Sequence, residues 1–175
     1  EGIWESYFEN GEINTKGRFV EGKMSGKCEV FYADGSRKTQ TDYLNGVKNG
    51  TEILYDENGS IYQKADYKDG VMNGRWERYV DGVLIEKGAY VEGKKDGLWV
   101  FYAQNGYKQR EQEFKQGKPD GRWVEYFSAN KKSAEGEYNE GQKSGTWMNY
   151  DKKGNVLSET VFKNGKKIKE EIKKK

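Results

Sequence analysis

The sequence of 175 residues has no histidine, one cysteine and one proline, and only 33% of its residues are hydrophobic. Without histidine the commonest general base and metal ligand are missing, and a single cysteine builds neither a thiolate metal cluster nor an internal disulfide. No apolar run approaches the roughly 20 residues that a membrane-spanning helix requires. These absences argue against a histidine- or thiolate-based enzyme, a disulfide scaffold and a helical membrane anchor.

A strong charge of one sign is also missing. The chain carries 31 lysines and arginines against 29 aspartates and glutamates. Seven lysines and two glutamates lie after residue 162. Residues 1–162 therefore carry 24 basic and 27 acidic residues, a net charge of -3. A surface for nucleic acid or anionic lipid would need clustered charge of one sign. We therefore expect no nucleic-acid partner and no membrane binding.

Glycine and aromatic residues are abundant, with 23 glycines and 14% aromatics, and they recur in register. The unit G-x-W-x-x-Y-x-x-x-G, followed by an aromatic residue, two residues and a glycine, occurs seven times with a period of 24 residues, once 23. A fixed period of this size is typical of a repeat array. The repeats open at Gly2, Gly26, Gly50, Gly74, Gly97, Gly121 and Gly145.

Each repeat predicts one β-hairpin, because alternating flanks surround a turn dipeptide. Asn-Gly and Asp-Gly supply the positive φ angles that a two-residue type I′ turn needs. We expect such turns at Asn10-Gly11, Asp34-Gly35, Asn58-Gly59, Asn105-Gly106 and Lys153-Gly154, with Ala129-Asn130 in the sixth repeat and a three-residue loop, Asp81-Gly82-Val83, in the fourth. The connections between hairpins are longer, and their two glycines, such as Gly22 and Gly26, predict a wider turn.

Symmetric pairing about these turns fixes the register of each hairpin. It places Phe8 opposite Ile13 and Trp4 opposite Gly17. A large ring lying across a glycine or small residue covers exposed backbone, which supports the register. The same arithmetic pairs Trp123 with Gly136, Trp147 with Thr160, Cys28 with Thr41, Glu52 with Ala65, Trp99 with Gln112 and Trp76 with Gly88.

These patterns predict an all-β fold, an elongated repeat array of antiparallel β-hairpins in a twisted single-sheet meander. We expect one repeat domain over 1–165 and a Lys-rich tail over 166–175 that blunts the last strand edge. The Trp side of the hairpins has fewer charges than the other side, which indicates a drier face. Its aromatic ladder is the candidate partner-binding groove, formed by Trp4, Trp76, Trp99, Trp123, Trp147, Phe19, Tyr43, Tyr67, Tyr90, Phe114 and Tyr138. The alternative, which we favour for most of the five tryptophans, is that the ladder is the core that holds the array together.

The recurring phrases G-x-W-x-x-Y-x-x-N-G and Y-x-x-G-K-x-x-G resemble the MORN repeat, in the variant common in bacterial proteins that include YwqK-type antitoxins. The resemblance covers residues 2–165. It implies an extended antiparallel β structure that serves as a scaffold or protein-binding surface. The third repeat departs from the pattern with Glu52 in place of Trp, and the sixth lacks the turn glycine.

Recurring carboxylates and glycines give little sign of catalysis. Glu111 with Glu113, and Glu135 with Glu137, alternate along a strand and so share a face, but charged rows are ordinary on a solvated strand face. The glycines form neither G-x-G-x-x-G nor a P-loop. We therefore expect no enzyme, no cofactor and no metal site. Cys28 occupies a Trp position, where we expect a small buried hydrophobe rather than a reactive thiol.

Three functions remain open. The first is a non-enzymatic scaffold that binds a protein partner along an elongated β surface, with end-to-end or edge self-association possible. The second, suggested by the family resemblance, is an antitoxin or immunity-type inhibitor of a toxin. The third is an aromatic-cage module for choline or cell-wall glycan. Because Glu1 stands just before a repeat glycine, we expect a processing boundary there, and an exported protein is slightly favoured over a cytoplasmic one.

Overall fold

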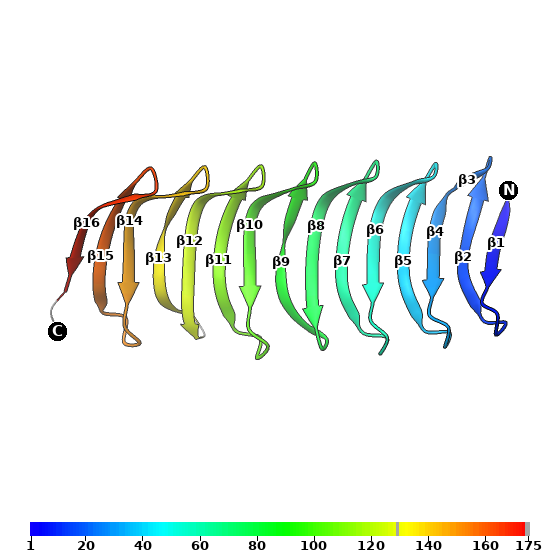
Figure 1. Ribbon diagram of the computed structural model, residues 1–175, viewed down its shortest axis with the longest axis horizontal. Helices are drawn as coiled ribbons and strands as arrows, with labels where there is room; N and C mark the ends of the chain where they lie inside the picture. The colour runs from blue at the N-terminus through cyan, green and yellow to red at the C-terminus, as the bar shows by residue number, and fades with distance from the viewer. Residues whose placement is uncertain (129, 174–175) are drawn as a thin grey trace. The chain divides into compact units, whose positions relative to one another are not determined.

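The computed structural model describes residues 1–128 and 130–173, where every regular element is a β-strand (Figure 1). Apart from the two-residue strand Lys23–Met24, strands that follow one another in sequence pair antiparallel, so the chain forms an open hairpin meander. The all-β hairpin fold predicted from the repeats is confirmed. Within the described residues, no helix has the length and apolarity needed to cross a membrane.

The chain divides into two compact units. The first contains residues 1–83 and 90–93, and the second contains residues 84–89 and those from 94 onward, so β9 (Val83–Val91) contributes to both. The first unit holds β1 (Gly2–Tyr7), β2 (Ile13–Val20), β3 (Lys23–Met24), β4 (Gly26–Phe31), β5 (Arg37–Leu44), β6 (Val47–Tyr55), β7 (Ile61–Lys68) and β8 (Val71–Val80). The second holds β10 (Lys94–Tyr102), β11 (Lys108–Lys115), β12 (Lys118–Ser128), β13 (Lys131–Asn139), β14 (Gln142–Tyr150), β15 (Val156–Lys163) and β16 (Lys166–Ile172).

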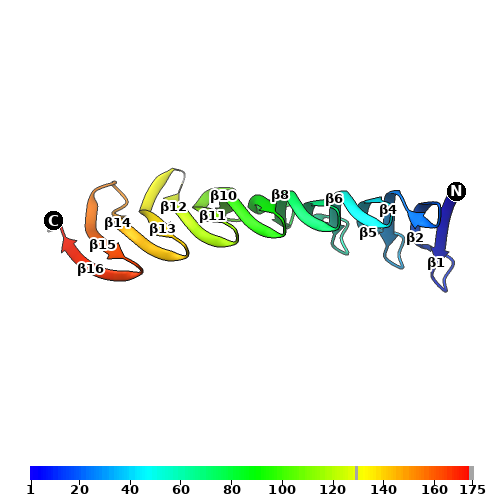
Figure 2. The same cartoon turned by 90° about the horizontal axis from the view of Figure 1, so that it is seen from above.

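In each unit the strands lie side by side in one layer (Figure 1, Figure 2). A β-sheet usually buries one face against a second layer. Here each face must be stabilised by side chains that lie across the backbone of neighbouring strands. Residues 166–172, within the segment predicted as a tail, pair with β15 as strand β16, and Lys174 and Lys175 lie outside the described residues.

Five turns predicted as two-residue type I′ turns are three-residue loops, so the prediction is wrong at Asn10-Gly11, Asp34-Gly35, Asn58-Gly59, Asn105-Gly106 and Lys153-Gly154. In the first hairpin Phe8 N–H donates to Glu12 O at 2.8 Å, and Gly11 N–H donates to Phe8 O at 3.0 Å. Only the glycine has positive φ, whereas a type I′ turn needs positive φ at both central residues. The Asn10 carboxamide accepts the Glu12 N–H at 3.1 Å, which stabilises this tighter local fold.

The connections between hairpins, predicted to be wide, are the two-residue type I′ turns. Asn45-Gly46, for example, has φ angles of 53° and 86°. The fourth repeat's loop also has two residues rather than three, since β8 ends at Val80 and β9 begins at Val83. The residues with positive φ at these turns are Glu21, Asn45, Asp69, Asp81, Glu92, Gln116, Glu140 and Asn164, each followed by a glycine. Ala129, of the predicted Ala129-Asn130 turn, lies outside the described residues.

The second glycine of several predicted wide turns lies in a β-bulge, as at Gly50, Gly74, Gly121 and Gly145. Gly50 has φ 125°, and a Cβ there would lie 2.7 Å from the Cβ of Asp42. The Asp42 carboxylate accepts the N–H of Thr51 at 3.2 Å, so an acidic side chain fills the opened ladder. Glycine is therefore required by both its backbone conformation and the neighbouring side chain.

The register predicted at the Trp positions is confirmed in the hairpins within each unit. Trp4 pairs with Gly17, Cys28 with Thr41, Glu52 with Ala65, Trp99 with Gln112, Trp123 with Gly136, and Trp147 with Thr160. Phe8 does not face Ile13, however, because Ile13 pairs with Tyr7. The three-residue loop shifts the register by one residue, and a bulge between Ser6 and Tyr7 shifts it back before Trp4.

Within each unit these pairs continue from hairpin to hairpin as a row across the strands, the Trp column. Several of its tryptophans lie next to a glycine or another small residue, and most of its members are buried. In the first unit it contains Trp4, Gly17, Cys28, Thr41, Glu52, Ala65 and Trp76, and in the second Trp99, Gln112, Trp123, Gly136, Trp147 and Thr160. The core is therefore a strip on one face of each unit.

The opposite face, the tyrosine face, contains two buried side chains that the sequence pattern did not indicate. Val100 is 7% exposed and Val124 is 0% exposed, and both pair with Glu111. Each valine has a charged residue opposite it on an adjacent strand. It lies on the face that has more charged residues in the sequence and was therefore expected to be the more hydrated one. The long aliphatic and aromatic parts of the surrounding side chains exclude water from both valines.

Candidate interaction surface

The aromatic ladder is the first candidate for a binding groove, and its buried members lie directly on the backbone. A Cβ added at Gly136 would lie 2.3 Å from the Trp147 ring, and one at Gly88 would lie 2.3 Å from the Trp99 ring. Each indole thus covers a glycine of the preceding strand. Trp99 is 0% exposed and Trp147 is 5% exposed.

The outer faces and polar atoms of these two rings are also occupied. Trp99 Nε1–H donates to Ala89 O, and Trp147 Nε1–H donates to Glu137 O, both at 3.2 Å. Lys95 Nζ lies 3.7 Å from the Trp99 ring centroid, and Lys143 Nζ lies 3.9 Å from that of Trp147. A cation that is already placed over the ring fills the position that a cage ligand would take.

The other ladder members pack edge-to-face beside the indoles. Ring centroids lie 6.2 Å apart for Trp4 and Phe19, and 6.1 Å apart for Trp99 and Phe114. Trp123 and Trp147 approach to 5.0 Å. Half-buried members are Phe19, Tyr43, Tyr67, Trp76, Tyr90, Phe114, Trp123 and Tyr138, whereas Trp4 is 45% exposed. The predicted groove residues are thus brought together mainly as a packed core.

Where the third repeat lacks its tryptophan, an ion pair takes the place of the ring. Glu52 is 7% exposed and pairs with Lys48, and Thr41 Oγ1 donates to the same carboxylate at 3.3 Å. Lys48 also lies 4.9 Å from the Tyr67 ring centroid. A buried carboxylate is tolerated here because it is both paired and hydrogen-bonded.

Carboxylates on the tyrosine face lie in fixed hydrogen-bonded clusters. The Tyr126 hydroxyl donates to Glu111 at 2.7 Å, and Lys108 Nζ lies 2.5 Å from the same carboxylate. Burial raises the pKa of Glu111, but the hydrogen bonds from Lys108 and Tyr126 outweigh it and hold the pKa below its usual value. Burial and the Glu111 hydrogen bond raise the pKa of Tyr126 to about 12. Glu111 is therefore held in its charged form and Tyr126 in its neutral form, so neither is suited to exchange protons near neutral pH.

Other reactive groups are equally constrained. Glu113, the neighbour considered as a partner for Glu111, accepts the Arg122 N–H at 2.8 Å instead. Burial, and then the nearby Glu29, raise the pKa of the Cys28 thiol, which disfavours the nucleophilic thiolate. The described residues contain no group of three or more side chains suited to hold a metal ion.

A second candidate surface, the turn-edge row, consists of the residues that flank the type I′ turns on the tyrosine face. The residue before each turn, such as Leu44 after Tyr43, follows an aromatic residue of the Trp face and so points to the opposite side. The residue after the turn pairs directly with it and therefore lies on the same face. In the first unit the row is mostly apolar and well exposed: Leu44 at 48%, Val47 at 46%, Val71 at 46% and Val91 at 40%. Leu44 and Val47 pair directly across a turn.

In the second unit the same row is basic. Lys115 pairs with Lys118, and Lys163 pairs with Lys166, each pair flanking one turn. These lysines and Lys94 are exposed. The repeat pattern missed both versions of the row, because it records the glycines of the turns and not the residues beside them. The turn-edge row could have been found only by aligning the seven repeats and reading the variable positions.

Backbone hydrogen bonds fix the turns along this edge. In the second unit, Gly117 N–H donates to Lys95 O at 2.8 Å, Gly141 N–H to Pro119 O at 2.7 Å, and Gly165 N–H to Lys143 O at 3.0 Å. Carboxylates add further contacts, since Asp120 accepts the Glu140 N–H at 3.0 Å. Each turn is thus hydrogen-bonded to the preceding repeat, and these bonds fix the backbone that carries the side chains of the turn-edge row.

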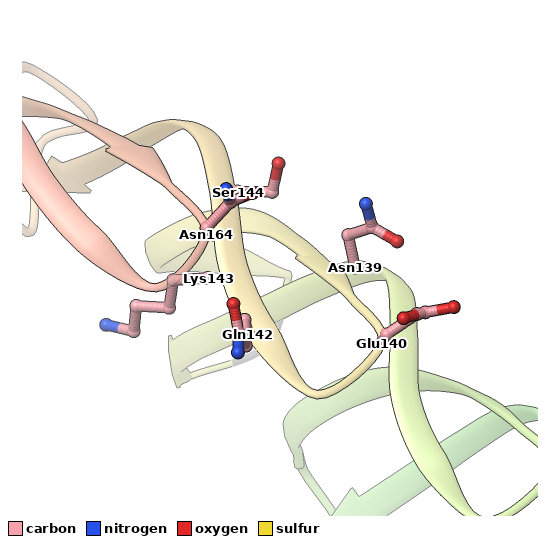
Figure 3. Close-up of a pocket in the computed structure, with 6 residues that line it drawn as sticks. All are labelled: Asn139, Glu140, Gln142, Lys143, Ser144 and Asn164. Carbon is pink, nitrogen blue, oxygen red and sulfur yellow. The ribbon is translucent and has the colours of Figure 1, made fainter.

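A small polar hollow of about 130 Å³ interrupts the basic row. It is lined by Asn139, Glu140, Gln142, Lys143, Ser144 and Asn164. Asn139 and Ser144 lie on one side of the ribbon, whereas Lys143 points away from them (Figure 3). Asn139 and Gln142 flank the turn at the positions where the neighbouring repeats have lysines. The hollow offers amide and hydroxyl groups rather than a converging catalytic set.

Comparison with known families supports the repeat assignment. The model of the MORN repeat variant matches the chain at residues 1–21, 48–69 and 143–164. Each matched segment contains one pair of neighbouring strands, β1 with β2, β6 with β7, and β14 with β15. The resemblance to MORN repeats is therefore confirmed at these three places. Repeats of this all-β type are consistent with a scaffold and are typically non-catalytic. No curated protein matches the chain.

Proposed function

We propose that this protein is a non-catalytic repeat scaffold that binds a protein partner through the turn-edge row of its first unit. The observation that carries the proposal is the exposure of Leu44, Val47, Val71 and Val91 at equivalent positions on a hydrogen-bonded edge. A surface that exposes neighbouring apolar side chains in register gains free energy when a partner covers it.

The geometry favours this function over an aromatic cage. Choline or a glycan ring needs an open aromatic face, but Trp99 and Trp147 are almost fully buried, with lysines over both rings. Using those rings as a cage would require moving groups that stabilise the fold. An inhibitor of a toxin would be one form of a protein-binding scaffold, and it would use the same exposed row.

The proposal is tested with the variant Leu44→Asp/Val71→Asp, which places two charges in the apolar row. Proteins captured by the wild-type chain are identified, purified and titrated against each variant. We expect about a hundredfold weaker binding, since two apolar contacts are lost and two carboxylates are desolvated. Tyr62→Asp is the matched control, because Tyr62 is 42% exposed in the same unit but does not flank a type I′ turn. Equal affinity of the wild type and the double variant would contradict the proposal.

A further inference from the structure

We propose that the basic part of the turn-edge row in the second unit recognises an acidic, extended segment of a protein partner. This inference rests on the proposed scaffold function and specifies the chemistry of a second contact. The lysine row consists of Lys94, Lys115, Lys118, Lys163 and Lys166.

In the described part of the chain, the lysines of the row have no carboxylate partner, whereas several other lysines of the same unit do. Lys95 pairs with Glu86 at 2.9 Å, Lys108 with Glu111 at 2.5 Å, Lys132 with Glu135 at 2.7 Å and Lys167 with Glu170 at 2.9 Å. Among the described residues, no ion pair within 4 Å includes a member of the row, and Lys94 contacts only the Gln116 amide at 3.5 Å. Carboxylates of the fold thus pair with Lys95, Lys108, Lys132, Lys167 and Lys173, while the lysines of the row remain available.

The net charges of the two parts of the chain also favour an acidic partner for the second unit. Residues 1–93 carry 12 basic and 17 acidic residues, a net charge of -5, whereas residues 94–175 carry 19 basic and 12 acidic residues, a net charge of +7. The overall charge of +2 conceals this division. A basic unit raises the local concentration of acidic partners and speeds their association.

The rigid edge sets the spacing of the lysines. Successive type I′ turns are two strands apart, so they recur about every 9.6 Å at 4.8 Å per strand. An extended peptide advances about 3.3 Å per residue, so every third residue would reach the next turn. Because hydrogen bonds hold each turn to the preceding one, binding would order the lysine side chains but not the backbone.

The hollow between Lys118 and Lys163 adds a polar contact in the middle of the row. Asn139 and Gln142 can both donate and accept hydrogen bonds, as the amide groups of an extended peptide also do. A chain with carboxylates at both ends of this stretch and an uncharged residue at its centre would match the order lysine pair, carboxamide pair, lysine pair.

A protein segment fits this surface better than nucleic acid or a membrane does. Glu113, Glu137 and Glu140 lie beside the lysines, and a continuous polyanion would meet them as well. No position of the row is an aromatic residue on which bases could stack, and the rings that lie next to these turns, such as Phe114 and Tyr138, are on the opposite face. Separate carboxylates on a flexible backbone can contact the lysines and avoid the acidic neighbours.

The test uses a fluorescent twelve-residue peptide with glutamate at every third position and serine elsewhere, titrated by anisotropy at low salt. Lys115→Gln/Lys118→Gln and Lys163→Gln/Lys166→Gln should each weaken binding about tenfold, and the quadruple variant more strongly. The matched control is Lys23→Gln/Lys68→Gln, which removes two charges at row positions of the first unit. It should leave the affinity within twofold, and added salt should weaken the wild-type complex.

The remaining arms separate the possible outcomes. Absence of peptide binding, or equal loss in the control variant, would overturn the proposal. Tighter, lysine-dependent binding of single-stranded DNA or of phosphatidylserine vesicles would overturn it in favour of those ligands. Leu44→Asp/Val71→Asp should still bind the acidic peptide, so that failure of the apolar contact and failure of the basic contact can be told apart.

Discussion

At the scale of single residues, the packing along the Trp column differs from one glycine to another. Gly136 lies under Trp147, whereas Gly17, at the same repeat position, lies beside the smaller Cys28. The two glycines have the same place in their hairpins but different neighbours. The tolerance of each position is therefore set by the residue in the following repeat.

This difference predicts opposite outcomes for one substitution. Gly136→Ala would place a Cβ 2.3 Å from the Trp147 ring and should destabilise the protein by about 1–3 kcal/mol, because a buried indole must move. Gly17→Ala would place its Cβ 3.6 Å from the Cys28 sulfur, an ordinary contact, and should be close to neutral. Urea unfolding of both variants measures the difference. Similar midpoints for the two would contradict the packing described for Trp147.

The hydroxyls of the tyrosine face predict a loss of stability in alkali. Tyr126 and Tyr150 have pKa values of about 12, the first raised by burial and then by Glu111, the second by its hydrogen bond to Glu135 and then by burial. Unfolding returns each pKa to about 10, so the stabilisation is complete below pH 10 and is lost as the pH rises through 12.

This pH dependence is measured as the urea midpoint between pH 8 and pH 12. Tyr126→Phe/Tyr150→Phe removes two of the titrating groups, so its midpoint should fall less steeply over that range. The variant should also be less stable at pH 8, because Glu111 and Glu135 lose a hydrogen-bond donor. An unchanged slope would show that these hydroxyls do not carry the alkaline sensitivity.

At the scale of elements, the two kinds of connection between strands are stabilised by different contacts. The three-residue loops are closed by local side chains, as Asn10 and Asp34 show. The type I′ turns form the hydrogen-bonded edge on which the proposed contact residues stand. Four of these turns begin with Glu or Gln at positive φ, a conformation that favours Asn or Asp.

The type I′ geometry predicts a gain in stability at one such turn. Glu140 has φ 48°, and Glu140→Asn should stabilise the protein by about 0.5–1 kcal/mol, because asparagine enters the left-handed region more easily. The reciprocal change, Asn164→Glu at φ 50°, should destabilise it by a similar amount. Thermal unfolding compares the two with the wild type. A stabilising Asn164→Glu would contradict the turn assignment.

The sequence correctly predicted the strand partners of Trp4 and Trp147, but it did not predict the length of the loops that close their hairpins. Any loop that keeps each tryptophan opposite a small residue satisfies the pattern, so a loop error and a bulge can cancel, as they do around Tyr7. Val124 could not be assigned to the core, because its burial depends on two flanking strands. For the interaction surface, the aromatic residues and the drier Trp side could be recognised from the sequence. A ring opposite glycine is compatible with either a groove or a core, so the sequence did not decide which rings are exposed.

At the scale of the whole molecule, each unit is a single layer of strands with two uncovered faces. The Trp column stabilises one face, while the tyrosine face holds Val100, Val124 and the Lys–Glu–Tyr clusters. Stability in such an array comes mainly from contacts between adjacent repeats. The residues that vary without disturbing these contacts, those beside the type I′ turns, are free to carry recognition. This separation explains why the proposed contacts lie at the turn edge rather than on the rings.

The most direct test of this account is hydrogen exchange of the five indole Nε1–H groups, followed by ¹⁵N NMR and assigned with single Trp→Phe variants. Trp99 and Trp147 donate to backbone carbonyls and are at most 5% exposed, whereas Trp4 is 45% exposed. We expect the Trp99 and Trp147 signals to persist at least a hundredfold longer than that of Trp4. Exchange of all three at one fast rate would contradict the claim that the aromatic ladder is the core of the fold.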